Sequence, residues 1–424
     1  MILGLKQGDR GAYVELIQLA LLRAGYAVSI DGIFGEATRS ALENFQVANR
    51  LDVTGVVDAP TETELLPYLK GYREVIVRPG DSFYSLARKY ETTVFAIRRA
   101  NEGIDPRNLA AGSEIIVPLG FDLVATNIHY TYYYLSILMD GLQARFPFCE
   151  ITTIGKTQLG KNIYCMGIGM GDMHLMYNAS HHANEWITTP LVLKFFEDYA
   201  IAVSGAERIY KYDALALYFK THLEIIPMVD ADGVDLVNGV VTEDALEGAQ
   251  YIAAAFPNIP FPAGWKANIG GVDLNLNYPA QWERAKQIKF AQGFDKPAPR
   301  DYVGPRPLSE PESLTMEQHT RKNNYLLTIS YHTQGRVIYW KFDDYLPPRS
   351  REIGEAFAAA SGYTLEITPT ASGAAGYKDW FIQEYNRPGY TVEVGLGQNP
   401  LPLSQFDEIY KNNLGIMTLG MYLL

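Results

Sequence analysis

The sequence predicts an α/β protein in which a large C-terminal region folds around a mixed β-sheet and is preceded by two small modules. In the C-terminal region, short apolar strand-like runs alternate with longer helical ones. Before residue 120 the pattern changes, first to amphipathic helices and then to a strand-helix-helix-strand order. The predicted domains are residues 1–70, 71–119 and 120–424, and a chain of 424 residues is long enough for about three domains.

The first module is predicted to be a small three-helix domain. Val14, Ile17 and Leu21 recur at helical spacing, and a glycine-rich turn that begins at Asp31 leads into a second amphipathic helix. The turn, Asp-Gly-Ile-Phe-Gly, and the Phe-Gln pair that closes the second helix resemble the motifs of peptidoglycan-binding domains. The resemblance covers about residues 5–70 and implies that this module binds peptidoglycan.

Residues 71–119 are predicted to form a small α+β module. A β-favouring run from Val75 leads through a Pro-Gly turn to a helix whose N-cap is Asp81 or Ser82, and a second helix and a closing strand follow. This order, with Asn101 and an Ile-Ile-Val-Pro ending, resembles a LysM domain. The resemblance implies binding to glycans that contain N-acetylglucosamine. The alternative is that both modules are degenerate spacers.

The third region, residues 120–424, is predicted to contain the mixed sheet, with helices on both faces. Its strand-like runs are Cys165–Ile168, Leu175–Asn178, Leu223–Met228, Tyr325–Tyr331 and Tyr390–Val394. Helical segments separate these runs. The candidate site residues fall near strand ends, where an α/β sheet forms its binding crevice.

His182 and Glu185 form a short His-x-x-Glu pattern after the second of these runs, which is typical of the start of a zinc peptidase site. In a chain with 7 histidines and 48 acidic residues such a pattern also arises by chance, so a third ligand and a base are needed. His332, at the end of the fourth run, supplies the ligand. Glu393, flanked by valines, supplies the base, because poor solvation raises the pKa of a carboxyl group. His181 is the alternative ligand, but the spacing to Glu185 favours His182.

A polar-apolar alternation from Gly271 to Pro279 is predicted to support this site. It places Asp273, Asn275 and Asn277 on one face of an extended segment. From that face Asp273 could orient a ligating imidazole by accepting its N–H group.

Together these motifs resemble those of the zinc carboxypeptidase family over residues 124–424. The matching segments occur in the family's order: His182 to Glu185, Gly271 to Asn275, Ser309 to Glu312, a strand that ends in His332, and Tyr390 to Glu393. The resemblance implies one zinc ion per chain, bound by His182, Glu185 and His332, with Glu393 as general base and proton shuttle.

Three departures from the family pattern concern the substrate. Exopeptidases of the family have an Asn-Arg pair whose Arg binds the C-terminal carboxylate of the substrate, but here Leu276 follows Asn275. A second family Arg is absent before Gly-Val-Asp, and Lys266 is the only nearby cation. The family's catalytic Tyr is absent before Ala371–Gly373, and Tyr377 is a candidate substitute.

The combination of a zinc peptidase core, Leu276 and two wall-binding modules resembles the γ-D-glutamyl-meso-diaminopimelate peptidases. The resemblance implies hydrolysis of peptidoglycan stem peptides, with the glycan and the stem peptide as partners. One alternative is a metallocarboxypeptidase that releases C-terminal residues. A second alternative is a non-catalytic peptidoglycan-binding protein with a decayed peptidase fold.

Composition excludes other classes of function. The net charge of −12 and the absence of a basic stretch with interleaved aromatic residues argue against nucleic-acid binding. The sequence contains neither a membrane span nor a signal peptide. Either an export signal has been removed, or, as we expect, the protein is made in the cytoplasm and acts at cell-wall or spore peptidoglycan. The two cysteines, Cys149 and Cys165, could pair or remain thiols.

The remaining charged candidates are predicted to lie outside the site. Arg306 and Lys378 could bind substrate carboxylates, but solvated surface charge is the preferred interpretation for both. Four further histidines match no motif and are interpreted as surface or packing residues: His129, His174, His222 and His319.

Overall fold

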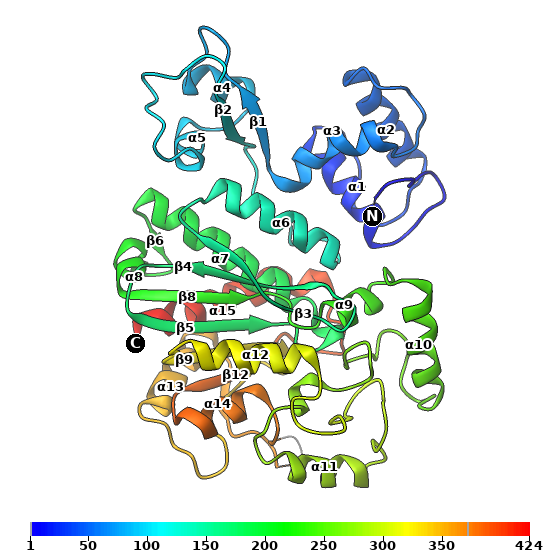
Figure 1. Ribbon diagram of the computed structural model, residues 1–424, viewed down its shortest axis with the longest axis vertical. Coiled ribbons are helices and arrows are strands. Elements are labelled where there is room, and N and C mark those ends of the chain that lie inside the picture. Colours follow the sequence, from blue (N-terminus) through cyan, green and yellow to red (C-terminus); the bar gives the residue numbers. More distant parts are fainter. Residues whose placement is uncertain (1, 371–372) are drawn as a thin grey trace. The chain divides into compact units, whose positions relative to one another are not determined.

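The computed structural model describes residues 2–370 and 373–424. The chain forms two compact units, residues 1–150 and 151–424, which are described separately below (Figure 1).

The first unit begins with the predicted three-helix module. Its helices are α1 (Ala12–Arg23), α2 (Glu36–Ala48) and α3 (Ala59–Lys70). Two buried glutamines hold the turns between them. Gln18 Oε1 accepts the backbone N–H groups of Asp31 and Gly32, and Gln46 Oε1 accepts those of Thr54 and Gly55. Gln46 is the glutamine of the Phe-Gln pair in the sequence motif. Its structural role is to accept backbone N–H groups that would otherwise be buried without a partner.

The LysM-like module follows in the same unit. It contains β1 (Tyr72–Ile76), α4 (Phe83–Lys89), α5 (Val94–Ala100) and β2 (Glu114–Pro118), and the two strands pair antiparallel. Ser82 caps α4 in a reciprocal capping box with Ser85. The Asn101 side chain donates to the carbonyls of Ile97 and Ile116 and accepts the N–H of Ile116, so it joins α5 to β2.

Helix α6 (Tyr132–Arg145) also belongs to this first unit, although it lies beyond the predicted boundary at residue 120. It packs against α3 at Gly141, where a Cβ atom would lie 2.2 Å from the carbonyl oxygen of Lys70. Only glycine permits so close an approach of the two backbones.

The second unit contains the predicted mixed sheet. Its eight strands lie in the order β11-β10-β12-β9-β5-β8-β4-β3. The pairs β12–β9, β9–β5, β5–β8 and β10–β11 are parallel, and the pairs β10–β12 and β4–β8 are antiparallel. The strands are β3 (Glu150–Lys156), β4 (Asn162–Ile168), β5 (Met173–Ala179), β8 (Thr221–Ile226), β9 (Leu327–Thr333), β10 (Val337–Tyr339), β11 (Thr364–Glu366) and β12 (Gly389–Val394).

Helices cover both faces of this sheet (Figure 1). Adjacent residues of β5 show the two sides: Met176 belongs to a core cluster that also contains Met316 and Trp380, whereas the Tyr177 hydroxyl donates to the carbonyl of Met417. One face therefore packs against α12 and α14, and the other against α15. The helices are α7 (Thr188–Gly205), α8 (Ala214–Lys220), α9 (Ala231–Val237), α10 (Glu243–Ala254), α11 (Trp282–Ala291), α12 (Pro311–Lys322), α13 (Ser350–Ser361), α14 (Tyr377–Tyr385) and α15 (Phe406–Tyr422).

Burial on both faces explains the strand-like runs of the sequence. Every residue of β9 is buried, which is the pattern expected of a central parallel strand. A short separate hairpin, β6 (Arg208–Ile209) with β7 (Tyr212–Asp213), follows α7. No helix among the described residues is both long enough and apolar enough to cross a membrane.

Candidate active site

Three buried side chains meet at the carboxyl ends of β5 and β9. His182 and Glu185 lie just beyond β5, where a single 3-10 turn, Ala183–Glu185, follows the strand, and His332 is near the end of β9. His182 Nδ1 lies 3.0 Å from Glu185 Oε2 and 3.0 Å from His332 Nδ1, and His332 Nδ1 lies 2.9 Å from Glu185 Oε2. The three predicted ligands thus present one compact triangle of two nitrogens and an oxygen.

The dimensions and chemistry of this triangle fit a zinc ion. Bonds of about 2.0–2.1 Å at tetrahedral angles separate ligand atoms by about 3.3 Å, close to the spacing found here. The other ring nitrogen of His182, Nε2, lies 3.0 Å from Asp273 Oδ1. Because a carboxylate only accepts, Nε2 carries the proton, and the lone pair of Nδ1 points at the second imidazole and at Glu185. A cation bound between these electron-rich atoms would offset their mutual repulsion.

Asp273 therefore occupies the orienting position that the sequence predicts. Its backbone begins the 3-10 turn Leu274–Leu276, which its side chain caps by accepting the N–H of Asn275 at 3.2 Å. Burial opposes its ionisation, but His182 and Lys266 hold the pKa of Asp273 well below its usual range. The same carboxylate, with Glu185, raises the pKa of His182 against the opposing effect of burial.

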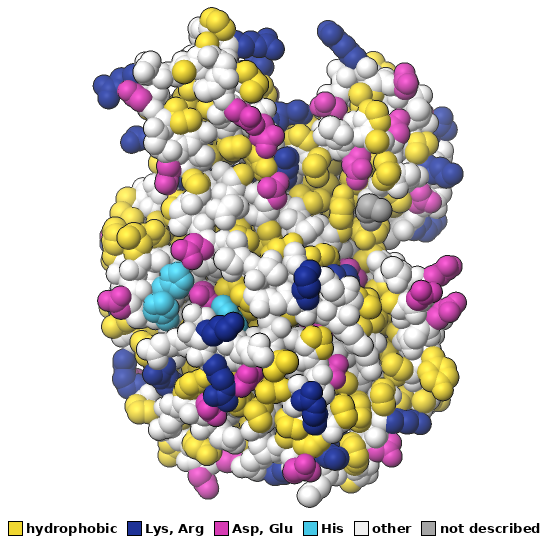
Figure 2. Space-filling model, in the orientation of Figure 1, with side chains coloured by type: hydrophobic (Ala, Val, Ile, Leu, Met, Phe, Trp, Pro, Cys, Tyr) yellow, Lys and Arg dark blue, Asp and Glu magenta, His cyan; other side chains and the backbone are white. Residues whose placement is uncertain are grey.

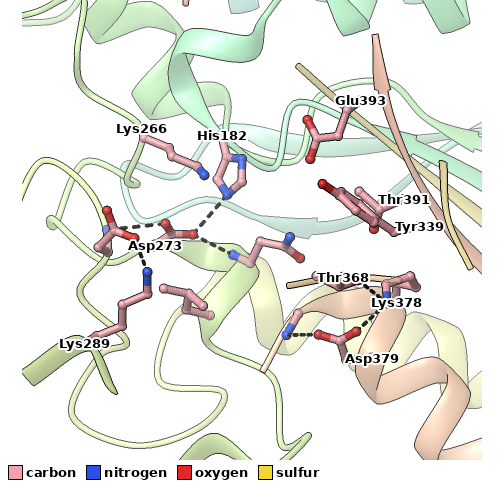
Figure 3. A pocket seen from close by; sticks show the side chains of 14 residues that line it. His182, Lys266, Asp273, Lys289, Tyr339, Thr368, Lys378, Asp379, Thr391 and Glu393 are labelled. Atoms are coloured by element: carbon pink, nitrogen blue, oxygen red, sulfur yellow. Dashed lines mark hydrogen bonds and ion pairs between the residues drawn. The ribbon is translucent and has the colours of Figure 1, made fainter. Parts of the chain in front are cut away.

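Glu393 lies beside the triangle because of strand register. In the parallel pair β12–β9 it is aligned with His332. Figure 3 shows its carboxylate directed into the same cavity as the His182 ring. Burial, reinforced by the negative charge of Glu185, raises the pKa of Glu393 to about 8.

His182, one corner of the triangle, lines a cavity of about 200 Å³ (Figure 3). Six of the predicted site residues line it: His182, Lys266, Asp273, Asn275, Leu276 and Glu393. The other lining residues are Lys289, Asp301, Tyr339, Thr368, Gly376, Lys378, Asp379 and Thr391. The cavity is thus walled by both signs of charge, with one large apolar residue among them.

The three lysines of the cavity differ in how they are held. Lys289 Nζ pairs with Asp301 at 2.6 Å, and Lys378 Nζ pairs with Asp379 at 2.6 Å. Lys266 has no ion pair with any of the residues that the structure describes. Burial opposes its charge, but the fields of Asp273 and Glu185 raise the pKa of Lys266. Lys266 is therefore a charged ammonium group available to a ligand.

Leu276 presents an apolar surface where exopeptidases of the resembled family have an arginine. It is 7% exposed and packs in a cluster with Trp282, Val303 and Ala375. Its neighbour Asn275 accepts the backbone N–H of Tyr377 at 2.9 Å, which fixes the start of α14 beside the cavity. The side chain at position 276 cannot bind a carboxylate.

Tyr377 does not reach the cavity, and the expectation that it serves there is wrong. It is fully buried, and its hydroxyl is 2.8 Å from Thr320 Oγ1 on α12. As the first residue of α14 it points to the α12 side of the sheet and joins the core cluster there. The sequence pattern could not show which way the first turn of this helix faces.

Two of the cavity residues that were not predicted as site residues bear on the chemistry of the site, Tyr339 and Lys378. Tyr339, on β10, pairs in register with Thr391 and lies below Glu393 in Figure 3. Lys378 was expected to be solvated surface charge, but it is 4% exposed and donates to the carbonyl of Lys341 at 2.9 Å. Its partner Asp379 is the next residue in the sequence. This adjacent opposite charge is the sequence feature that could have indicated a paired, buried lysine. Arg306 is exposed, as expected.

His181 does not belong to the triangle, although its ring stacks on that of His332. Its Nε2 lies 3.0 Å from the Tyr278 hydroxyl, and burial, with the neighbouring imidazoles, holds the pKa of His181 well below its ordinary value. Cys149 and Cys165 are both buried thiols rather than a disulfide. Of the family segment that lacks its Tyr, Ala371 and Ser372 lie outside the described residues.

A buried His-Glu-His triangle beside a carboxyl group of raised pKa, at the carboxyl ends of central strands of a mixed sheet, defines a metallopeptidase type of site. The zinc carboxypeptidase family matches residues 135–415, and the chain belongs to this family. The peptidoglycan binding domain matches residues 10–65 and the LysM domain matches residues 75–118, which confirms the nature of the two predicted modules.

The comparisons with individual proteins agree. Gamma-D-glutamyl-L-diamino acid endopeptidase 1 of Lysinibacillus sphaericus is 42% identical over 403 residues, which cover 82% of this chain and 100% of that protein. The crystal structure of thrombin activatable fibrinolysis inhibitor has a TM-score of 0.58 at 15% identity, covering 83% of this chain and 98% of that one. Carboxypeptidase A from Helicoverpa armigera has a TM-score of 0.52 at 17% identity, covering 92% and 87%. At these identities the solved structures show the fold alone.

Proposed function

We propose that this protein is a zinc-dependent peptidase that hydrolyses the bond between γ-D-glutamate and meso-diaminopimelate in peptidoglycan stem peptides. The observation that carries the proposal is Leu276, which lines the cavity beside the metal triangle. An apolar residue there removes the requirement for a free C-terminus. The Lysinibacillus sphaericus relative, an endopeptidase by name, and the two wall-binding modules support the same substrate class.

The residues of the cavity divide the work of amide hydrolysis. A zinc ion held by His182, Glu185 and His332 would supply Lewis-acid chemistry. Glu393 takes the proton of the attacking water and delivers it to the leaving amine, for which a pKa near the working pH is suited. Tyr339 presents a phenol to the same cavity.

The charges of the cavity suit this substrate. A γ-linked D-glutamate retains its α-carboxylate close to the scissile amide, and Lys266 offers an ammonium group that makes no ion pair within residues 2–370 and 373–424. Asp379 and Lys378 lie together on the α14 side, where a diamino acid with its own amine and carboxylate would meet both signs of charge. We assign Lys266 to the glutamyl carboxylate and the Lys378–Asp379 pair to the diamino acid.

The two N-terminal modules would hold the enzyme on its polymeric substrate. They belong to domain types that bind peptidoglycan, so we propose that the enzyme acts at cell-wall or spore peptidoglycan. Their affinity adds to that of the cavity by raising the local concentration of stem peptides.

Mass spectrometry of defined stem peptides tests the proposal. Zinc-loaded protein is incubated with L-Ala-γ-D-Glu-meso-diaminopimelate peptides whose C-termini are free or amidated, and with matched peptides that contain lysine. Release of L-Ala-D-Glu from both the free and the amidated diaminopimelate peptides is expected. Cleavage of the free form alone would instead support a carboxypeptidase that releases C-terminal residues.

Glu393→Gln is the control for the chemistry. The amide keeps the size of the side chain but cannot accept the proton, so turnover should fall by about 10²-fold or more while zinc content is unchanged. Full activity of this variant would overturn the role of Glu393. Wild-type protein that holds no zinc and cleaves no peptide would support the non-catalytic alternative.

A further inference from the structure

A second cluster of metal-ligating side chains lies on the sheet face that α12 covers. Cys165 on β4, Glu224 on β8 and His319 on α12 each offer one ligand atom, and these atoms all lie within 4.8 Å of one another. Among the described residues, this cluster and the His182–Glu185–His332 triangle are the groups with this property. Nothing in the proposed peptidase chemistry uses Cys165, Glu224 or His319.

The register of the sheet explains why these side chains meet. Glu224 pairs with Gly167 in the antiparallel pair β8–β4, and Cys165 lies two residues before Gly167, so both side chains project from the same face. His319 reaches that face from α12, and the Tyr325 hydroxyl contacts both Glu224 and His319. Figure 2 shows histidine side chains at the surface over this part of the sheet.

The cluster is partly shielded but still accessible. Cys165 is 4% exposed, whereas the side chains of His319 and Glu224 are 14% and 13% exposed. A cation could therefore enter from solvent and then be enclosed on the side of the thiol. The neighbouring His222 has its Nε2 3.7 Å from Glu224 Oε1.

Four polar atoms from other side chains lie close to the Nε2 atom of His319. His319 Nε2 lies 2.6 Å from Glu224 Oε2, 2.9 Å from the Tyr325 hydroxyl, 3.4 Å from Asn323 Nδ2 and 3.7 Å from Cys165 Sγ. The Tyr325 hydroxyl and the Cys165 thiol also donate to Glu224 Oε2, so nitrogen, oxygen and sulfur atoms of the kinds that bind metals converge on one point.

The distances match those around a tetrahedral zinc ion more closely. Bonds of about 2.3 Å to sulfur and about 2.0–2.1 Å to nitrogen or oxygen place sulfur about 3.6 Å from the other ligand atoms. Cys165 Sγ lies 3.7 Å from His319 Nε2 and 3.3 Å from Glu224 Oε2. On the same geometry the nitrogen-oxygen separation, 2.6 Å, must widen by about 0.8 Å and the sulfur-oxygen separation by about 0.3 Å.

We propose that Cys165, Glu224 and His319 bind a second divalent cation of the zinc class, which fastens α12 to strands β4 and β8. A thiolate and an imidazole favour zinc over magnesium or calcium, which prefer oxygen ligands. The Tyr325 hydroxyl or a water molecule completes the four ligands. The cation has a structural role, because its ligands come from three elements and none of them lines the active-site cavity.

Zinc stoichiometry on the full chain tests this proposal. Wild type, Cys165→Ser and His319→Gln are equilibrated with zinc at a fixed free concentration, and zinc per chain is measured by mass spectrometry of the element. The matched control is Cys149→Ser, which removes the other buried thiol. Wild type and the control should each hold two zinc ions per chain, and the other two variants one.

Cobalt substitution reports on the thiolate directly. A ligand set of two histidines and a glutamate has no sulfur, so a thiolate-to-cobalt charge-transfer band can arise only from a cysteine site. The band is expected in wild type, in Cys149→Ser and in Glu185→Gln, whose active-site metal is weakened, and it should be lost in Cys165→Ser. Wild-type protein with one zinc ion per chain and without the band would overturn the proposal, even if Cys165→Ser failed to fold.

Discussion

At the scale of single residues, the site separates two tyrosines that the sequence alone could not tell apart. Tyr339 lines the cavity beside Glu393, and Tyr377 points away from it into the α12 side of the core. Burial, with the nearby Glu393 carboxylate, raises the pKa of Tyr339, so its phenol keeps its proton and can donate a hydrogen bond to substrate. The two residues therefore make a matched pair for mutagenesis.

Tyr339→Phe should lower kcat/KM on the stem peptide by about 10–100-fold, the range expected for loss of one positioned donor or acid. Tyr377→Phe should leave kcat/KM near the wild-type value but lower the free energy of unfolding by about 1 kcal/mol, because its hydrogen bond to Thr320 is lost. Steady-state kinetics and denaturant unfolding of both variants check this. A loss of turnover in Tyr377→Phe with Tyr339→Phe unaffected would reverse the assignment.

Leu276 is the residue on which substrate choice depends. Leu276→Arg should create a carboxylate-binding guanidinium in the cavity, so the preference for a free over an amidated C-terminus should rise by about 10-fold. Leu276→Met, which preserves the apolar surface, is the control. Comparison of kcat/KM for the two peptides measures the preference, and an unchanged ratio in Leu276→Arg would show that position 276 does not face the substrate terminus.

At the scale of elements, a buried carboxyl group joins α12 to the loop between β3 and β4. Glu312, near the start of α12, accepts the backbone N–H of Gln158 at 2.8 Å. Burial raises the pKa of Glu312 to about 7, with Asp232 and Glu310 contributing in the same direction. Because the folded pKa lies above the unfolded value, this group's contribution to stability is present at low pH and is lost as pH rises through about 7.

Glu312→Gln removes this titration while keeping an acceptor for Gln158. Its free energy of unfolding should match that of wild type near pH 4.5 and exceed it at pH 8 by up to about 3 kcal/mol, an upper bound from the shift of the Glu312 pKa. Thermal or denaturant unfolding across this pH range measures the difference. A constant difference at every pH would show that Glu312 does not titrate in this window.

Much of the fold and site followed from the sequence, for identifiable physical reasons. His182, Glu185, His332 and Glu393 were found because strand-ending ligands leave a local pattern. Tyr339, Lys378 and the Cys165 cluster were missed because their significance depends on which strand ends and helix faces meet. The spacing of residues along the chain does not show which distant segments come into contact in the fold.

At the scale of the whole molecule, every ligand and cavity residue lies within residues 151–424, whereas the wall-binding modules lie within residues 1–150. Damage to a module should therefore change activity on the polymer but not on a soluble peptide. Gln46 is a suitable position because its Oε1 accepts two buried backbone N–H groups in the first module.

Gln46→Leu leaves those N–H groups without their acceptor, which should cost the module about 1–3 kcal/mol for each group left unsatisfied. Release of peptide from insoluble peptidoglycan should fall several-fold, while kcat/KM on the soluble stem peptide stays at the wild-type value. Parallel assays on the two substrates make the comparison. Equal losses on both would show that the first module also supports the catalytic unit.

The order of the site residues along the chain has a consequence for the cell that makes the protein. The candidate metal ligands come from β9 and from the segment after β5, but the proposed base is on β12, which follows both of them in the chain. During synthesis the wall-binding modules emerge before the catalytic unit, and the proposed base is added after all three candidate metal ligands. A ribosome-bound or prematurely terminated chain can therefore fold its binding modules, yet it carries no complete hydrolase until the central sheet has received one of its last strands.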